Sequence, residues 1–188
     1  MPTAENERPM RIGEDFKVLL AADDIATRVR ELGQAITRDY EGKELTLVAV
    51  LKGSFLFMAD LARAIDLPLT CEFLGLSSYG SRRESSGIVK ITQDLTQPVK
   101  GRHVLVVEDI IDTGLTISYL ISNLRTRLPE SVRIAALLYK PDNNKIPCKI
   151  DYLGFTIPNK FVVGYGLDLD GCYRNLPFIG VKSPDDAA

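Results

Sequence analysis

A chemically dense stretch of the sequence runs Glu-Asp-Ile-Ile-Asp-Thr-Gly-Leu-Thr from Glu108 to Thr116. When ionised, Glu108 and Asp109 can accept hydrogen bonds but cannot donate them. They are therefore better suited to bind two vicinal sugar hydroxyls than a phosphate. The rest of the stretch leads into an expected helix, whose first turn offers unpaired N–H groups and a partial positive charge to a phosphate. The residues expected to hold a sugar phosphate are Glu108, Asp109, Asp112, Thr113, Gly114, Leu115 and Thr116.

The same residues also fit a plainer interpretation. Glu108, Asp109 and Asp112 could simply be a solvated strand end, and Thr113-Gly114 could be an ordinary turn. The whole string favours the sugar-phosphate interpretation more than the acids alone do. In open α/β sheets, ligands bind at the carboxyl ends of the strands, which is where this string is expected to lie.

Hydrophobic periodicity indicates the elements that must position this stretch. Apolar, β-prone segments predict strands at 45–51, 69–77, 88–94, 103–107 and 132–139. Apolar residues at helical spacing predict helices from Ala22 to Tyr40 and from Phe55 to Ile65. A third helix is marked by Ile117, Leu120, Ile121, Leu124 and Leu128. The alternation predicts an α/β fold with a central, mostly parallel sheet flanked by helices on both faces.

Length and composition favour a single domain, because 188 residues of which 45% are hydrophobic can bury one sizeable core. After Pro141, short strands near 150–155 and 161–165 replace the alternating pattern, which suggests a small hood. The expected divisions are a core at about 12–140, a hood mainly at 141–182 with the N-terminal segment, and polar tails at 1–10 and 183–188.

Composition also restricts the partners and the location. A formal net charge of -2 gives no basic field, so no nucleic-acid partner is expected. No apolar run approaches the roughly 20 residues that cross a bilayer, so no membrane association is expected. The three cysteines are widely spaced and form no C-x-x-C motif, which favours reduced thiols in a cytoplasmic protein. The single histidine, His103, opens a strand far from the acids and is interpreted as an ordinary strand-end residue.

The stretch from Val104 to Thr116 resembles the phosphoribosyl pyrophosphate motif of the type I phosphoribosyltransferase family. The resemblance extends from Leu45 to about Val181 and is greatest to the hypoxanthine-guanine branch of that family. The matching segments are Leu51–Ser54, Ser78–Tyr79, Glu108–Thr116, and Lys140 with Phe161–Tyr165, Asp168 and Arg174. The resemblance implies transfer of the phosphoribosyl group from phosphoribosyl pyrophosphate to hypoxanthine or guanine, giving IMP or GMP plus pyrophosphate. It also implies a homodimer or homotetramer.

The resemblance further implies a role for each matching residue. Asp112 is the general base that faces the purine N7, and the Leu51–Lys52 peptide bond is cis. The polar loop from Ser78 to Gly87 closes over the site as a lid. The pyrophosphate-binding residues are Lys52, Gly53, Ser78, Tyr79 and Arg174, and the purine-binding residues are Ile110, Lys140, Phe161, Val162 and Asp168. Mg²⁺ is the implied cofactor, with Glu108, Asp109 and Asp168 as the metal-site residues.

Several of these segments have alternative interpretations. Lys52-Gly53-Ser54 could be a simple strand-to-helix turn with Ser54 as the N-cap, and 81–86 could be an ordinary hairpin. Phe161 and Val162 could be the core of a short strand. The chain also departs from the family at Asp142-Asn143-Asn144, where many relatives carry basic residues, and at Leu169–Cys172.

Two other functions compete with catalysis. A non-catalytic regulator on the same fold is disfavoured by the presence of Lys52 and Asp112 and by the negative net charge. A phosphoacceptor signalling domain also places an acidic pair after an apolar strand. Such domains carry the pair on the first strand, whereas here the pair lies in the middle of the chain.

Overall fold

A six-stranded sheet forms the centre of the protein, in a computed structural model that describes residues 16–78 and 89–182. The elements in chain order are β1 Phe16–Leu20, α1 Ala22–Asp39, β2 Leu45–Leu51, α2 Phe55–Ala64, β3 Leu69–Ser78, β4 Val89–Gln93, β5 His103–Ile111, α3 Leu115–Arg125, β6 Ser131–Tyr139, η1 Pro141–Asn143, β7 Tyr152–Thr156, β8 Val162–Val163 and β9 Ile179–Lys182. The strand order is β4-β3-β2-β5-β6-β7, and β4 alone among these strands pairs antiparallel to its neighbour. The predicted α/β fold with a mostly parallel sheet is confirmed.

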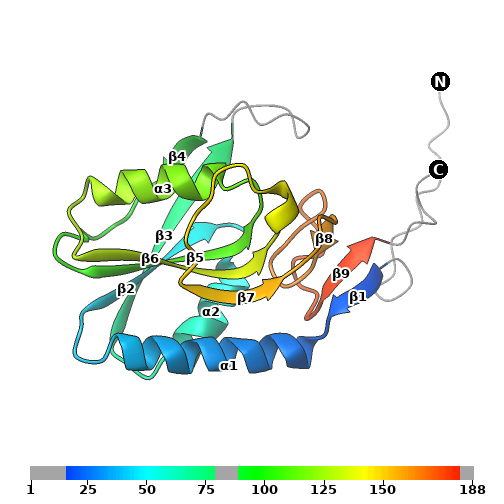
Figure 1. The fold of residues 1–188 in the computed structure, drawn as a ribbon, viewed down its shortest axis with the longest axis horizontal. Helices are drawn as coiled ribbons and strands as arrows, with labels where there is room; N and C mark the ends of the chain where they lie inside the picture. Colours follow the sequence, from blue (N-terminus) through cyan, green and yellow to red (C-terminus); the bar gives the residue numbers. More distant parts are fainter. Residues whose placement is uncertain (1–15, 79–88, 183–188) are drawn as a thin grey trace.

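Helices cover both faces of this sheet, with α1 and α2 on one face and α3 on the other (Figure 1). The apolar stripe of α1 is buried, as Ile25, Val29 and Ile36 show. Gly33 lets α1 approach α2 closely, because a side chain there would collide with Ala64. The two helical layers explain why β2 and β5 are apolar along nearly their whole length.

The strand order reverses between β2 and β5. From β2 the chain moves outward to β3 and β4, and from β5 it moves outward in the other direction to β6 and β7. The two strands pair in parallel from Leu45↔His103 to Ala49↔Val107, and each then continues to its own carboxyl end. Such a switch point is where open α/β sheets bind ligands, so the fold directs attention to the loops after β2 and β5.

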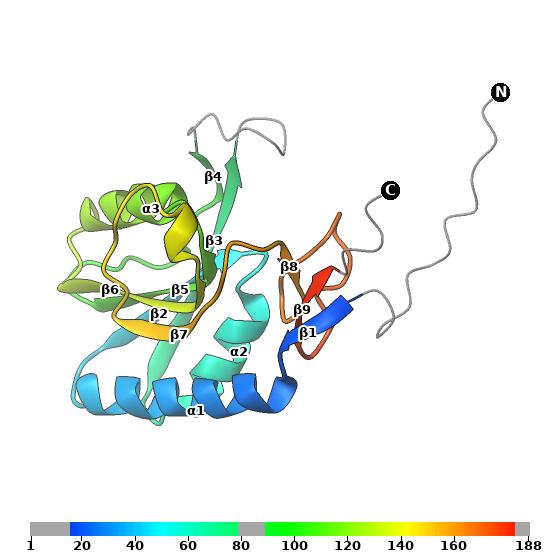
Figure 2. The ribbon, with the colours of Figure 1, turned by 45° about the vertical axis from the view of Figure 1, so that its right-hand side comes forward.

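A separate three-stranded sheet, in the order β1-β9-β8, forms the hood (Figure 2). Strand β9 lies in the middle and pairs antiparallel with both neighbours, joining Phe16 to Lys182 and Val162 to Val181. The N-terminal strand is therefore part of this three-stranded sheet.

The structure corrects the expected composition of the hood at one strand. β7 lies within the predicted 141–182 hood but pairs in parallel with β6 and completes the central sheet. Its outer edge is held by α1, where Arg28 donates hydrogen bonds to the carbonyl oxygens of Leu153 at 2.7 Å and Gly154 at 3.1 Å. The sequence gives no sign that β7 belongs to the central sheet, because an irregular connection and not a helix precedes it.

Two predicted boundaries were also wrong. Strand β5 continues past residue 107 to Ile111, because β6 extends alongside it and Ile111 pairs with Tyr139. Glu108 and Asp109 thus lie within the strand and do not follow it. Helix α3 ends at Arg125, and Leu128, expected on its apolar stripe, has φ 55° and is 64% exposed.

Across residues 16–78 and 89–182, no helix combines the length and the hydropathy needed to cross a membrane.

Candidate active site

The carboxyl end of β5 opens into a pocket of about 290 Å³ that contains most of the predicted sugar-phosphate residues. The pocket is lined by Val50, Glu108, Asp109, Ile110, Ile111, Asp112, Thr113, Gly114, Thr116 and Ile117. Val50 comes from β2, so the pocket lies at the switch point between β2 and β5. The fold thereby brings the stretch from Glu108 to Thr116 to the position where a ligand is expected.

The start of α3 is shaped to receive an anion. Gly114, at the N-cap, has φ 81°, a left-handed conformation that other residues rarely adopt. It carries no side chain to cap the helix, and the contact from the Leu115 N–H to Thr113 Oγ1 is long, at 3.4 Å. The N–H groups of the first turn, with the positive end of the helix dipole, are therefore available to an anion without a competing side-chain cap.

The acids of β5 are held in an environment that disfavours their charge. Glu108 is buried, and burial, followed by the charge of Asp109, raises its pKa well above the usual value. Burial also raises the pKa of Asp109 to about 6, although the Ile110 N–H at 2.9 Å and the charge of Arg174 oppose the rise. Donors that reach these carboxyl oxygens would stabilise the ionised forms, and two sugar hydroxyls are suitable donors.

The loop after β2 packs directly on these acids. A side chain at Gly53 would collide with the carboxylate of Asp109, and one at Gly166 in the hood would collide with the carbonyl oxygen of Gly53. The Leu51–Lys52 peptide bond is cis, as the family resemblance implies. The loop that carries Lys52 is thus enclosed between β5 on one side and the hood on the other.

Ser54 follows this loop at the N-cap position of α2, which agrees with the simpler interpretation of Lys52-Gly53-Ser54 as a strand-to-helix turn. Its hydroxyl, however, is completely buried and donates to the carbonyl oxygen of Val50 at 2.6 Å, so it does not cap the helix. This bond fastens the loop back onto β2.

The hood contributes a second pair of charged residues to the same region. Asp168 forms an ion pair with Arg174 at 2.6 Å and also accepts a hydrogen bond from the Gly171 N–H at 2.7 Å. Arg174 donates in turn to the carbonyl oxygen of Gly166. The charges of both residues act on Asp109, which places them on the acid side of the pocket.

The purine side of the predicted site is formed around Asp112. Lys140 is buried, and its ammonium lies 3.9 Å from Asp112 Oδ2. Asn143 donates a hydrogen bond to Asp112 Oδ1, and the Asn144 amide lies 3.5 Å from the Asp112 carbonyl oxygen. The Asn143 contact was not predicted, since Asn143 and Asn144 appeared in the sequence only as departures from the family. The signal was indirect: β5 and β6 are parallel neighbours, so the loops that follow them must meet.

The two expected hood residues next to the purine differ in exposure. Phe161 is 56% exposed, so the alternative of a core role is wrong for its side chain. Val162 lies in β8 and is buried, so the core-strand interpretation is confirmed for that side chain. Ser78 ends β3, whereas Tyr79 and the expected lid up to Gly87 lie outside the described residues.

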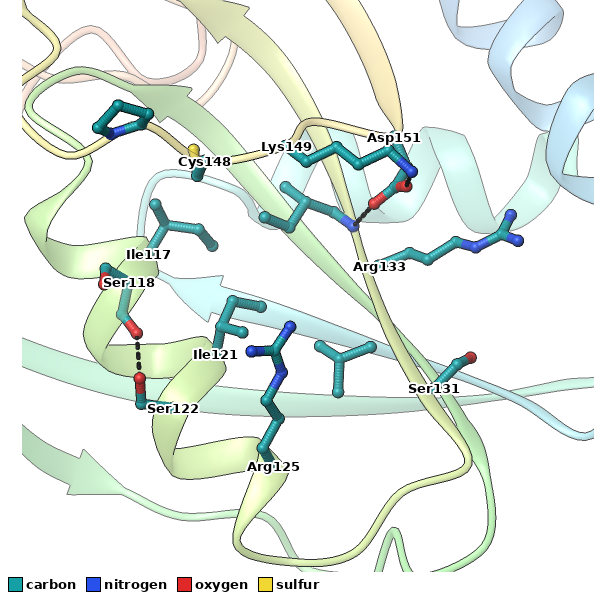
Figure 3. Close-up of a pocket in the computed structure, with 13 residues that line it drawn as sticks. Ile117, Ser118, Ile121, Ser122, Arg125, Ser131, Arg133, Cys148, Lys149 and Asp151 are labelled. Carbon is teal, nitrogen blue, oxygen red and sulfur yellow. Dashed lines mark hydrogen bonds and ion pairs between the residues drawn. The ribbon is translucent and has the colours of Figure 1, made fainter.

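A larger pocket, of about 470 Å³, lies between α3, β6 and the segment at 147–151 (Figure 3). It is lined by Ile117, Ser118, Ile121, Ser122, Arg125, Ser131, Val132, Arg133, Ile134, Pro147, Cys148, Lys149 and Asp151. The one carboxylate in its lining, Asp151, already has partners. It forms an ion pair with Lys149 at 3.0 Å and accepts a hydrogen bond from the Ile134 N–H at 3.0 Å. Despite its size, this pocket lacks the acids of β5, so the smaller pocket is the candidate active site.

Comparison with known proteins identifies the family of the chain. The family model for the phosphoribosyl transferase domain matches residues 16–170. A hypoxanthine-guanine phosphoribosyltransferase of Mycobacterium avium is 50% identical over 178 residues, which cover 92% of this chain and 88% of that protein. The corresponding protein of Streptococcus pneumoniae is 51% identical over 165 residues, or 88% of this chain and 92% of its own.

The fold agrees as well. A crystal structure of a hypoxanthine phosphoribosyltransferase from Staphylococcus aureus superposes with a TM-score of 0.87 at 43% identity and covers 92% of this chain and 94% of its own. The matched region includes both β2 and β5 and the start of α3, which together form the pocket. The chain therefore belongs to the phosphoribosyltransferase family, within its hypoxanthine-guanine group.

Proposed function

We propose that this protein transfers the 5-phosphoribosyl group of phosphoribosyl pyrophosphate to hypoxanthine or guanine, releasing pyrophosphate and forming IMP or GMP. The observation that carries the proposal is the pocket at the end of β5, which brings together an uncapped helix start, the buried Glu108 and the partly buried Asp109, and Asp112, whose carboxylate lies 3.9 Å from the Lys140 ammonium. The names of the relatives at about half identity support the same activity.

The sugar phosphate occupies the end of the pocket formed by β5 and α3. The 5′-phosphate accepts hydrogen bonds from the N–H groups of the 112–116 turn and from the hydroxyls of Thr113 and Thr116. The ribose hydroxyls donate to Glu108 and Asp109, which stabilises the ionised form of both acids. This binding fixes the anomeric carbon in front of the purine.

The purine lies between Asp112 and the hood. Asp112 removes a proton from N7 while N9 attacks the anomeric carbon, a role typically worth about 10²- to 10⁴-fold in rate. Lys140 donates to the 6-oxo group, and Phe161 stacks on the ring through its exposed face. Ile110 lines the opposite face. The main-chain carbonyl oxygens of Val162 and Asp168 accept hydrogen bonds from the 2-amino group of guanine.

The leaving pyrophosphate is bound by the loop after β2. Lys52 and the backbone of Gly53 neutralise its developing charge, with help from Arg174 on the hood side. The family resemblance implies that a lid containing Ser78 and Tyr79 covers it, although Tyr79 lies outside the described residues. Closure excludes water, which would otherwise hydrolyse the positively charged sugar in the transition state.

The acids of the site fit Mg²⁺ as a cofactor that is shared with the substrate. Within the described parts of the chain, no group of three His, Cys, Asp or Glu side chains could hold a metal ion unaided. Glu108, Asp109 and Asp168 nevertheless supply the hard oxygen ligands that Mg²⁺ prefers, and substrate oxygens can complete the set. When bound, Mg²⁺ would neutralise charge on the departing pyrophosphate.

The same proposal includes a cytoplasmic location and a homodimer or homotetramer, as the family resemblance implies. Sedimentation equilibrium of the purified chain measures the oligomeric state directly, and a monomer at micromolar concentration would contradict this part.

A panel of four bases tests the activity. The protein is mixed with phosphoribosyl pyrophosphate, Mg²⁺ and hypoxanthine, guanine, xanthine or adenine, and pyrophosphate release is followed. Hypoxanthine and guanine should give rapid release, adenine should give almost none, and chelation of the metal should stop the reaction. A non-catalytic regulator or a phosphoacceptor domain would release no pyrophosphate with any of the bases.

A further inference from the structure

Asp112 is held at one of its two carboxyl oxygens. Asn143 Nδ2 donates to Oδ1, while Oδ2 faces the Lys140 ammonium at 3.9 Å, which is too far for a strong hydrogen bond. The Asp112 side chain is 40% exposed and lines the pocket. The carboxylate thus has one oxygen bound to a neutral donor and one oxygen directed to the side where the purine is proposed to lie.

The position of Asn143 is set by the backbone around it. The Lys140 N–H donates to the Ile111 carbonyl oxygen at 3.0 Å, and the N–H groups of Lys145 and Ile146 both donate to the Thr113 carbonyl oxygen, at 2.9 and 3.1 Å. These bonds fasten the 140–146 segment to the 111–113 segment without using any side chain. The side-chain bond from Asn143 to Asp112 is therefore additional to the attachment of the loop and acts on the carboxylate itself.

A neutral donor has a different effect from a cation at this position. A lysine or arginine would form an ion pair with Oδ1 and compete with the purine N–H for the carboxylate. The Asn143 amide fixes the orientation of the group and leaves its negative charge unmatched except by Lys140.

We propose that Asn143 is a positioning residue for catalysis: it holds the Asp112 carboxylate in the orientation that accepts the purine proton. This inference rests on the proposed transfer reaction and on the role of Asp112 in it. Asn143 itself touches no reacting atom. Its removal should leave the substrates bound and slow only the step in which the proton moves.

Two variants test the idea. Asn143→Ala removes the donor, and Asn143→Asp keeps the shape but sets a second carboxylate against the first. We expect the single-turnover rate with hypoxanthine to fall about ten- to a hundredfold in Asn143→Ala and further in Asn143→Asp, with the affinity for phosphoribosyl pyrophosphate unchanged. The matched control is Asn123→Ala on α3. The side-chain oxygen of Asn123 accepts a hydrogen bond from Arg127 at 2.9 Å, and Asn123 does not line the pocket. This variant should keep the wild-type rate.

Two further measurements distinguish positioning of the base from a general structural effect. A hypoxanthine analogue with a more acidic ring N–H, such as 8-azahypoxanthine, needs less help from a base, so the loss in Asn143→Ala should shrink with it. In an Asp112→Asn background, Asn143→Ala should cost little more, because the two residues act through one carboxylate. Thermal unfolding of each variant verifies that it is folded.

The outcomes separate this inference from the proposed function. If the wild-type protein releases no pyrophosphate with hypoxanthine, the proposed function fails and takes the role of Asn143 with it. If the wild type is active but Asn143→Ala retains its rate within about twofold, only the positioning role is overturned. The positioning role is also overturned if Asn143→Ala lowers the rate equally with hypoxanthine and 8-azahypoxanthine. It is likewise overturned if the loss of rate in Asn143→Ala adds fully to the loss in Asp112→Asn.

Discussion

Two residues of the site, Glu108 and Asp109, lie in surroundings that lower the stability of the fold. Glu108 and Asp109 are adjacent acids in a mostly apolar strand, and burial raises the pKa of both. The charge of Arg174 opposes the rise at Asp109, but Arg174 is already paired with Asp168 at 2.6 Å. Such acids are suited to bind hydroxyl groups or a cation, and they weaken the empty fold.

This cost should depend on pH. Asp109 has a pKa of about 6 in the folded protein and about 3.9 when unfolded, so folding favours its protonated form. Its contribution to stability is complete below about pH 4 and is lost as the pH rises through about 6. Without ligand or divalent metal, Asp109→Asn should therefore melt higher than the wild type at about pH 7.5, and the gap should narrow towards pH 5. A gap in melting temperature that does not change with pH would contradict this assignment.

Lys140 should determine which purine is accepted. Its buried ammonium can donate to a 6-oxo group, whereas the 6-amino group of adenine would leave it unpaired. Lys140→Ala should lower kcat/KM for hypoxanthine while the value for adenine changes little, so the ratio between the two bases should narrow by about tenfold or more. The measurement is kcat/KM with each base at saturating phosphoribosyl pyrophosphate. An unchanged ratio would remove Lys140 from base selection.

The sequence predicts residues of this kind unevenly. Glu108, Asp109 and Asp112 were identifiable because they interrupt an apolar run in a specific string. Asn143 was not, because its role depends on a contact between loops 31 positions apart, and an asparagine in a polar loop has many ordinary explanations. Gly53 likewise owes its importance to a distant neighbour, the carboxylate of Asp109.

At the scale of elements, the start of α3 has the most demanding geometry. Gly114 combines a φ of 81° with close packing, since any side chain there would collide with the carbonyl oxygen of Ile146. The glycine is thus required by the left-handed turn and by the neighbouring loop together. The turn that presents N–H groups to a phosphate is built from two segments that meet at this residue.

Gly114→Ala should therefore disrupt phosphate binding more than it disrupts the fold. We expect affinity for IMP to fall by at least about tenfold, because the strained turn must shift and the N–H groups lose their common direction. Gly42→Ala is a suitable control: Gly42 also has a positive φ, of 72°, but has nothing within 4 Å of the added methyl group. It should bear only the backbone strain and bind IMP normally, as isothermal titration can measure.

Element centres were predictable and element ends were not. Apolar runs identified β2, β5 and β6, since strands covered by helices on both faces must be apolar throughout. The last residues of β5 were missed, because their pairing with β6 holds polar residues in the strand. β7 was assigned to the hood, since an edge strand with no preceding helix carries no signal of the sheet it joins.

At the scale of the whole molecule, the site lies where the central sheet and the hood meet. The loop after β2 touches β5 through Gly53 and the hood through Gly166, so substrates bound as proposed would contact both parts at once. The sequence predicted two parts and their order. The contact between them could not be predicted, because it depends on glycines whose neighbours lie far away in the chain.

Ligands that bridge the two parts should stabilise the protein most. In the proposed site, IMP would contact the phosphate turn and the purine side, whereas ribose 5-phosphate would reach only the phosphate turn. At concentrations of about a hundredfold the dissociation constant, a ligand adds about 2.7 kcal/mol to the stability of the folded state, so weaker binding shows as a smaller rise in melting temperature at equal concentration. IMP should therefore raise the melting temperature clearly more than ribose 5-phosphate, and hypoxanthine alone should raise it least. Equal shifts for all three would argue against a site shared by sheet and hood.

The hood sheet joins β1 to β9, so its middle strand is among the last parts of the described chain to be synthesised. When the turn before α3 has been synthesised, the hood still lacks its central strand. A product truncated before Ile179 would keep the residues that line the β5 pocket but lack the strand that joins β1 to β8. The first and the last strand of the described chain must therefore meet before the hood sheet exists.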